Sequence, residues 1–203
     1  MTHRLYSAFK FALPLLILLI FWEFCVQFFQ VNARVFPSIE AVFKAGLEAI
    51  NDGSIFNHIA ASLGRVAVGT LLAVLVSIPL GVAMGLNPIV SDFLSPLFRF
   101  FSVLAGIAWI PIATLWFGYG FGAITFVIFN AVFFVVTYNT LLGVASIPMP
   151  LRNAAASLGA NGWTLLTQVI LPGALPNIVT GIRTGLGFAW VNARGRLYLK
   201  EWR

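Results

Sequence analysis

An uncharged apolar run from Val66 to Leu86 restricts what this chain can fold into more than any other feature of its sequence. A helix of that length, at about 1.5 Å per residue, matches the roughly 30 Å hydrocarbon core of a bilayer. Composition agrees, because 60% of the 203 residues are hydrophobic and 9% are charged, whereas about 25% of residues in soluble domains are charged. The sequence therefore predicts an all-α membrane protein in which residues 66–86 form one span.

Three more apolar segments predict further spans, at residues 11–29, 100–117 and 121–143. Only the corner Gly118-Tyr119-Gly120 separates the last two segments, so we expect them to be antiparallel neighbours in a membrane hairpin. The first segment contains Glu23, the only acid in the four spans. Near the end of its helix this carboxylate either reaches interfacial water or serves a proton relay. The expected fold is a polytopic helical bundle with four full spans.

Basic residues predict the orientation of these spans. Arg4 and Lys10 place residues 1–10 in the cytoplasm, so residues 30–65 lie outside and residues 87–99 and 144–177 lie inside. The same basic residues could begin a signal peptide, but no small-residue cleavage site follows the apolar run, which favours an uncleaved span. The predicted protein is therefore a multi-pass protein of the cytoplasmic (inner) membrane.

The external segment 30–65 contains a predicted amphipathic helix. Its apolar residues recur at helical spacing, and Ser38 stands where an N-cap belongs. Acidic and basic residues alternate on the polar face, with Glu40 four residues before Lys44. We expect this helix to lie on the membrane surface or on the bundle, with its polar face in water.

Several classes of function lack the residues that they need. The 12 basic residues are diluted among apolar ones, which excludes the dense basic surface of a nucleic-acid-binding protein. The sequence contains neither G-x-S-x-G nor H-E-x-x-H, and it has no G-x-x-x-x-G-K-[ST] loop for ATP. Cys25 is the lone cysteine, so an intrachain disulfide and a multi-cysteine metal site are excluded. We therefore predict no catalytic residue, metal or cofactor, and any ATP must bind to another chain.

Polar and small residues inside the spans allow two interpretations. Asn130, Thr137 and Asn139 would face other helices or a wet cavity more cheaply than lipid. The motifs Gly81-x-x-x-Gly85 and Gly181-x-x-x-Gly185 permit close approach of helices. Such residues indicate either ordinary packing within the bundle or the lining of a translocation pathway.

The segment 144–177 is the most informative part of the chain. Prolines at 148 and 150 open a short helix, alanines fill it, and Gly159 stands where a left-handed C-cap belongs. A second helix should begin near Trp163 and stop at Leu171-Pro172-Gly173. The first helix is too small to bury much of itself, and its smooth alanine face suits docking into a groove of a partner.

This segment resembles the E-A-A-x(3)-G-x(9)-I-x-L-P loop of bacterial ABC importer permeases. The matching residues, with Asn in place of Glu and Val in place of Ile, are Asn153, Ala154, Ala155, Gly159, Val169, Leu171 and Pro172. Residues 108–118 and 175–183 are similar to stretches of the nitrate/sulfonate/taurine subgroup of that family.

The resemblance implies the fold of a type I ABC importer permease, whose subunit forms the pathway for a small oxyanion of the nitrate, sulfonate or taurine class. It implies two ATP-binding cassette subunits, an external substrate-binding protein and a second permease copy, in a homodimer or a heterodimer. The short alanine helix would dock into the ATPase, with Gly159 permitting the turn and Ala154 and Ala155 permitting close packing. Thr137, Asn130 and Asn139 would line the pathway.

Two other functional classes fit the sequence less well. A self-sufficient channel or secondary transporter would have charges or broken helices near the bilayer midplane, and the sequence predicts neither in its second to fourth spans. An intramembrane enzyme would need an acid/base pair, which the spans lack.

The C-terminal part departs from the family pattern. Residues 178–191 are too few for an easy crossing and predict only a partial fifth span, and residues 192–203 form a basic tail. We expect this departure to reflect a truncated product or a shifted reading frame rather than a genuine five-span variant.

Overall fold

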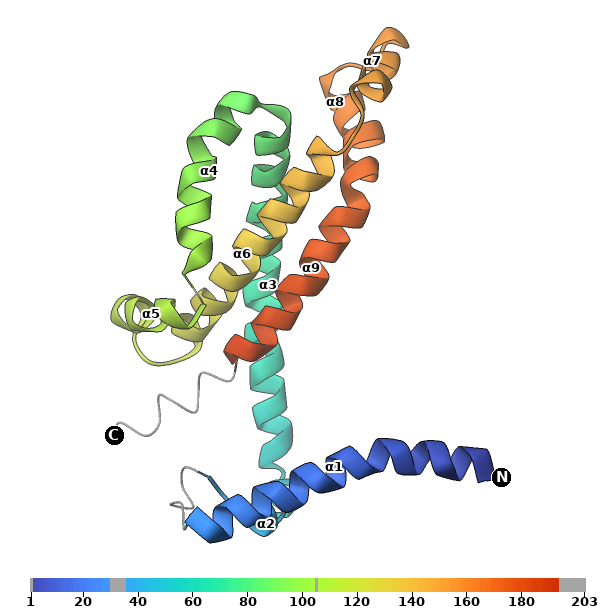
Figure 1. The fold of residues 1–203 in the computed structure, drawn as a ribbon. Helices are drawn as coiled ribbons and strands as arrows, with labels where there is room; N and C mark the ends of the chain where they lie inside the picture. Colours follow the sequence, from blue (N-terminus) through green and yellow to red (C-terminus); the bar gives the residue numbers. More distant parts are fainter. Residues whose placement is uncertain (1, 30–35, 105, 194–203) are drawn as a thin grey trace. The chain divides into compact units, whose positions relative to one another are not determined.

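The computed structural model describes residues 2–29, 36–104 and 106–193, and every regular element in these ranges is a helix (Figure 1). This confirms the all-α fold class. The chain divides into two compact units, residues 1–60 and residues 61–203.

In the first unit, the neighbouring residues Trp22 and Glu23 of one helix bond to the backbone at the start of the next helix. α1 covers Thr2–Phe29 and α2 covers Ile39–Asn51. The Glu23 Oε2 atom accepts a hydrogen bond of 3.2 Å from the backbone N–H of Ile39, the first residue of α2. The Trp22 indole N–H donates to the carbonyl of Pro37 at 3.1 Å. Glu23 thus anchors the start of α2.

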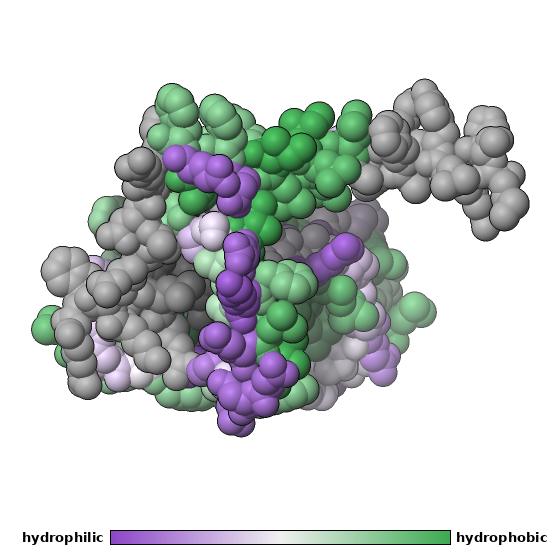
Figure 2. Space-filling view, turned by 90° about the horizontal axis from the view of Figure 1, so that it is seen from below, coloured by the Kyte–Doolittle hydropathy of each residue, from purple (hydrophilic) through white to green (hydrophobic). Residues whose placement is uncertain are grey.

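The amphipathic character of α2 agrees with the sequence. The Ser38 side chain accepts a hydrogen bond from the backbone N–H of Ala41, which confirms the predicted N-cap. Lys44 Nζ lies 2.6 Å from Glu40 Oε1, and both side chains are well exposed. Figure 2 shows a row of hydrophilic residues flanked by hydrophobic ones.

The turn after α2 leads into α3, which covers Ser54–Leu86. The Asp52 Oδ1 atom accepts a hydrogen bond of 2.9 Å from the backbone N–H of Ser54. Hydrogen bonds from Ser54, first from its backbone and then from its side chain, hold the pKa of the exposed Asp52 carboxyl below its ordinary value.

The second unit has a core made by three helices: the part of α3 from Ala61 onward, α6 (Phe121–Ala145) and α9 (Leu171–Ala193). α6 is the central helix, since both others pack against it (Figure 1). One cluster joins Val66 and Ala73 of α3 to the middle of α6 and to Ala189 of α9. A second cluster joins Val82 of α3 to Val144 and to residues Ile170, Ala174 and Ile178. Burial on both sides of α6 explains why that helix is apolar around most of its circumference.

Glycines bring these helices into close contact. A Cβ added at Gly81 would lie 2.6 Å from the Thr140 Cβ, and one added at Gly181 would lie 2.7 Å from the Asn139 Cβ. Gly85 meets Val144 in the same way, also at 2.6 Å. Both G-x-x-x-G motifs therefore serve helix packing, the first between α3 and α6 and the second between α9 and α6.

Within the described ranges, three helices are long and apolar enough to cross a membrane, namely Ser54–Leu86, Phe121–Ala145 and Gly162–Val191. A shorter apolar helix, Leu13–Phe28, lies within the segment 11–29. The predicted spans 66–86 and 121–143 lie inside the first two of these helices, and the number of spans stays a prediction.

The predicted helix at 100–117 is wrong, because that segment is broken. α4 covers Pro88–Val103 and ends at Leu104, whose backbone is extended; the 3-10 turn η1 (Gly106–Trp109) follows, and then α5 (Ile110–Phe117). Pro111 stands in the first turn of α5, where its missing N–H costs nothing, so it starts a helix instead of kinking one. Residues 87–99, expected as a loop, form most of α4, which Asn87 caps.

The predicted helix end at Leu171-Pro172-Gly173 is also wrong. α8 (Gly162–Leu165), the π-helical turn η2 (Leu166–Ile170) and α9 run on as one helix. In η2 the backbone N–H of Leu171 donates to the carbonyl of Leu166, five residues back. This wider turn shifts the hydrogen-bond register just before Pro172, which lacks an N–H to donate. Residues 178–191, which the sequence predicts as a partial span, thus belong to a long helix. Of the predicted basic tail, residues 194–203 lie outside the described ranges.

Candidate functional site

The short helix in the segment 144–177 forms as its sequence predicts. α7 covers Met149–Ser157, with Pro148 as N-cap and Pro150 in its first turn. It ends on Gly159, whose φ of 88° is left-handed. The Gly159 N–H donates to the Ala156 carbonyl and the Ala160 N–H to the Ala155 carbonyl, each at 3.0 Å. This hydrogen-bond pair is a Schellman motif, which confirms the predicted C-cap.

Two polar contacts hold α7 in place between the end of α6 and the start of α8 (Figure 1). The Arg152 guanidinium donates to the carbonyl of Val144, one of the last carbonyls of α6. A basic group at this helix end complements the helix dipole. The Asn161 Oδ1 atom caps α8 by accepting from the Thr164 N–H at 3.1 Å.

The α7 segment, residues 149–163, leaves large apolar side chains uncovered in this unit. Leu158 is 89% exposed and Trp163 is 73% exposed, and Met149 and Leu151 are also exposed. Of the motif residues, Asn153, Ala154, Gly159 and Pro172 are exposed, and Ala155, Val169 and Leu171 are half-buried. Leu171 packs against the second core cluster of the bundle, so the far half of the motif secures the long helix.

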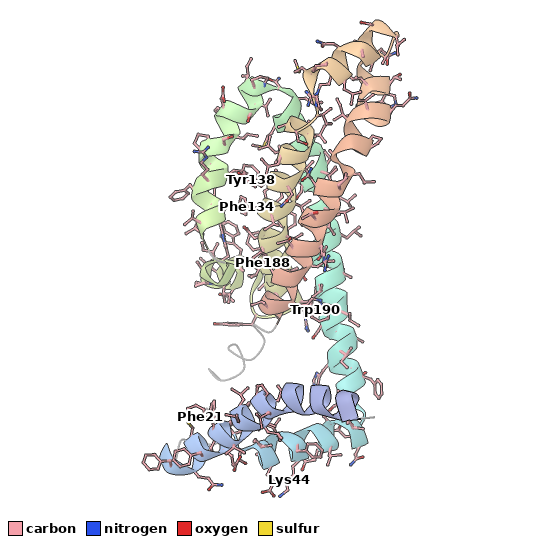
Figure 3. All side chains as sticks on the ribbon, turned by 45° about the vertical axis from the view of Figure 1, so that its right-hand side comes forward. Phe21, Lys44, Phe134, Tyr138, Phe188 and Trp190 are labelled. Atoms are coloured by element: carbon pink, nitrogen blue, oxygen red, sulfur yellow. The ribbon has the colours of Figure 1, made fainter. Side chains whose placement is uncertain are left out.

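The three residues expected to line a pathway meet at one cavity. This cavity has a volume of about 840 Å³, and Asn130, Thr137 and Asn139 all contribute to its wall. Thr137 is fully buried and donates its hydroxyl to the Phe133 carbonyl at 2.8 Å, and the Asn139 amide donates to the Val135 carbonyl at 2.8 Å. Figure 3 labels three further wall residues: Phe134, Tyr138 and Phe188.

The opposite wall of this cavity was missed by the sequence analysis. It consists of α4 residues Ser91, Ser95, Phe98, Arg99 and Ser102. The sequence analysis predicts no helix in the segment 87–99, which it places on the cytoplasmic side between two spans. Asn87-Pro88 is a helix start that could have revealed α4, and the spacing of Ser91, Ser95 and Arg99 then places these residues on one face.

This wall stands against the middle of α6. The Phe98 ring lies 5.5 Å from the Phe133 ring and 5.3 Å from the Phe134 ring, and these residues are central in Phe121–Ala145. α4 therefore ends beside the middle of α6 with Arg99 next to Phe98, and the segment predicted as the third span contains a break.

Comparison with known proteins identifies the family. Residues 74–199 match the family model described as binding-protein-dependent transport system inner membrane component. A putative ABC transporter permease protein of Methanocaldococcus jannaschii is 36% identical over 186 residues, which cover 90% of this chain and 69% of that protein. The taurine transport system permease protein TauC of Escherichia coli is 41% identical over 146 residues, covering 72% and 53%.

The bicarbonate transport system permease protein CmpB of Synechococcus elongatus is 39% identical over 140 residues, covering 69% of this chain and 50% of that protein. The chain thus spans about half the length of TauC and CmpB and somewhat more of the archaeal relative. The resemblance to ABC importer permeases is confirmed. This membrane protein belongs to the family of binding-protein-dependent transport system inner membrane components.

Proposed function

We propose that this chain is the membrane-spanning permease subunit of an ABC importer for a small oxyanion of the nitrate, sulfonate or taurine class. Family membership supports the permease role, and relatives named for taurine and bicarbonate transport support a small anionic substrate. The observation that carries the proposal is the α7 segment, a capped helix with exposed apolar residues at the end of the bundle.

In this proposal the α7 segment docks into a groove on a cytoplasmic ATPase subunit. Leu158 and Trp163 are largely uncovered, so burying them against a partner would stabilise the complex. Arg152 ties α7 to the last turn of α6, so movement of α7 would reach the central helix of the bundle directly. Closing of the ATPases on ATP would then switch the permease between outward-facing and inward-facing forms.

The proposed assembly contains two ATP-binding cassette subunits, a second permease copy and an external substrate-binding protein. The end of the bundle that carries α7 faces the cytoplasm, and so does the N-terminus, as Arg4 and Lys10 favour. Asn130, Thr137 and Asn139 then belong to the pathway wall, with two of them fixed by bonds to carbonyls of their own helix. The chain itself supplies no ATPase site.

Uptake by cells tests this proposal. The chain is expressed with the ATPase and the binding protein encoded by neighbouring reading frames, and uptake of labelled taurine, nitrate and bicarbonate is measured. We expect ATP-dependent uptake of one of these anions that is lost when the chain is omitted. No uptake above the omission control, with all components present in the membrane fraction, would contradict the proposal.

A further inference from the structure

α4 presents a polar row to the cavity. Ser91, Ser95, Arg99 and Ser102 follow one another at intervals of four, four and three residues, and all four line the cavity wall. The Ser91 and Ser95 hydroxyl oxygens are 3.5 Å apart, and the Ser102 hydroxyl donates to the Arg99 carbonyl at 3.2 Å. Helical spacing therefore places two serine hydroxyls within one turn of the guanidinium.

The rest of the wall adds polar groups and no negative charge. Asn130, Tyr138 and Asn139 of α6 contribute amide and hydroxyl groups. Trp109 also lines the cavity, and its buried indole N–H, which can only donate, has no acceptor among the described residues. Arg99 is the one charged residue among the wall residues described, and no ion pair joins it to a carboxylate within the described ranges.

Arg99 is an exposed residue of this chain, and its position beside the middle of α6 makes its charge consequential. The ring of Phe98, the preceding residue, packs at an angle against the rings of Phe133 and Phe134 in the middle of α6, one of the helices long enough to cross a membrane. An arginine at that level is costly in lipid, and such residues face a wet cavity and pair with an opposite charge. Here the cavity is present and the opposite charge is absent from its described wall.

We propose that Arg99, with the hydroxyl of Ser95, binds one small oxyanion in this cavity. A guanidinium offers paired N–H donors that match two oxygens of a sulfonate, carboxylate or nitrate group. The cavity, at about 840 Å³, also leaves room for the water that accompanies such an ion. The inference rests on the proposed function only in regarding this anion as the transported substrate. The positive charge of the cavity does not depend on the proposed function.

The charge of the cavity is measured on the full chain in phosphatidylcholine vesicles. Cys25 is the lone cysteine, so Cys25→Ser gives a cysteine-free background. Ser95→Cys then places a thiol in the cavity, and its reaction rate is compared for an anionic sulfonatoethyl and a cationic trimethylammonioethyl methanethiosulfonate. Ser157→Cys, on the exposed surface of α7, is the matched control.

We expect Arg99→Gln to lower the anionic-to-cationic rate ratio at Ser95→Cys at least about tenfold, because it removes a positive charge one helical turn away. Arg99→Lys, which keeps the charge, should preserve the ratio, and the ratio at Ser157→Cys should not change. An unchanged ratio at Ser95→Cys in Arg99→Gln, or a thiol that neither reagent reaches, would overturn the inference.

Protection experiments identify the source of the oxyanion. Millimolar taurine, nitrate, bicarbonate or sulfate should slow labelling of Ser95→Cys while Arg99 is present and have no effect in Arg99→Gln. Protection that requires phosphatidylglycerol in the vesicles would assign the site to a lipid headgroup and overturn it as a site for a free oxyanion. Anion protection in a chain that supports no uptake would overturn the proposed function and leave the binding site standing.

Discussion

Gly159 is a residue whose backbone decides the shape of the proposed docking segment. Its φ of 88° is left-handed, and a Cβ added there would meet nothing within 4 Å, so a substitution acts through backbone strain alone. A side chain in this conformation costs about 1–2 kcal/mol, and more for a β-branched residue. We expect Gly159→Val to separate ATP hydrolysis from uptake, with hydrolysis retained and labelled-anion uptake reduced several-fold.

Two substitutions control this prediction. Asn tolerates left-handed backbone, so Gly159→Asn should keep more uptake than Gly159→Val. Gly162 also has no atoms near its Cβ position but lies in an ordinary helical turn, so Gly162→Ala should leave uptake unchanged. Normal uptake by Gly159→Val in a normally assembled complex would argue against the role given to this turn.

Gly181 tests the close approach of α9 to α6. A methyl group there would lie 2.7 Å from the Asn139 Cβ and 3.3 Å from the Val136 Cα. Overpacking of this kind costs about 1–3 kcal/mol, because backbone must move. We expect Gly181→Ala to lower the midpoint of thermal unfolding in detergent. Gly187→Ala on the same helix, where a Cβ meets nothing within 4 Å, should not lower it; equal midpoints for the two variants would refute the packing argument.

At the scale of single residues, caps could be predicted from the sequence, but the burial of a charged residue could not. Ser38 and Gly159 were predicted correctly, because caps depend on a few neighbouring residues. Arg65 ends the segment 30–65, which the sequence predicts to lie outside, but it is 7% exposed and its guanidinium lies 6.0 Å from the centre of the Phe121 ring. That environment comes from a residue far along the chain, which a local pattern does not reveal.

At the scale of elements, Arg152 is the contact that joins α7 to α6. Its guanidinium donates to the Val144 carbonyl, and hydrogen bonds from charged groups contribute about 1.5–3 kcal/mol. We expect Arg152→Gln to loosen α7 without unfolding the bundle. Hydrogen exchange should then accelerate for the amides of residues 149–163 and stay unchanged for those of α6; uniform acceleration in both, or none in either, would contradict this assignment.

The neighbouring Asn153 provides the comparison. Its side chain is exposed, and it stands where the family motif has Glu. Asn153→Glu should leave hydrogen exchange in α7 unchanged, because the side chain is exposed. Its effect should instead be confined to association with the ATPase, measured as the amount of ATPase that co-purifies. Faster exchange in α7 of this variant would show that residue 153 also secures the helix.

Element boundaries were predicted where the signals are local and missed where they are not. The helices at 39–51 and 149–157 follow from caps, prolines and glycine. The helix through Pro172 was missed because a π-helical turn, five residues long, shifts the backbone hydrogen-bond register just before that proline. The break between Val103 and Ile110 was missed because apolar composition alone does not distinguish one span from two short helices.

At the scale of the whole molecule, the second unit combines a packed three-helix core with a polar cavity. The sequence predicted a bundle and three wall residues, all from α6. It could not predict the α4 wall, since that wall requires α4 to fold back beside Phe133 and Phe134. The family, by contrast, was evident from one motif with fixed internal spacing, which is independent of how the helices pack.

Site-specific photo-cross-linking tests the central claim most directly. Benzoylphenylalanine is placed at Leu158, beside α7, or at Tyr119, in the corner before α6; both positions are exposed, and they lie at opposite ends of α6 in the chain. In membranes that contain the neighbouring ATPase, irradiation should cross-link the ATPase to position 158 and not to position 119. A co-purifying ATPase that cross-links equally at both positions, or only at 119, would contradict the account.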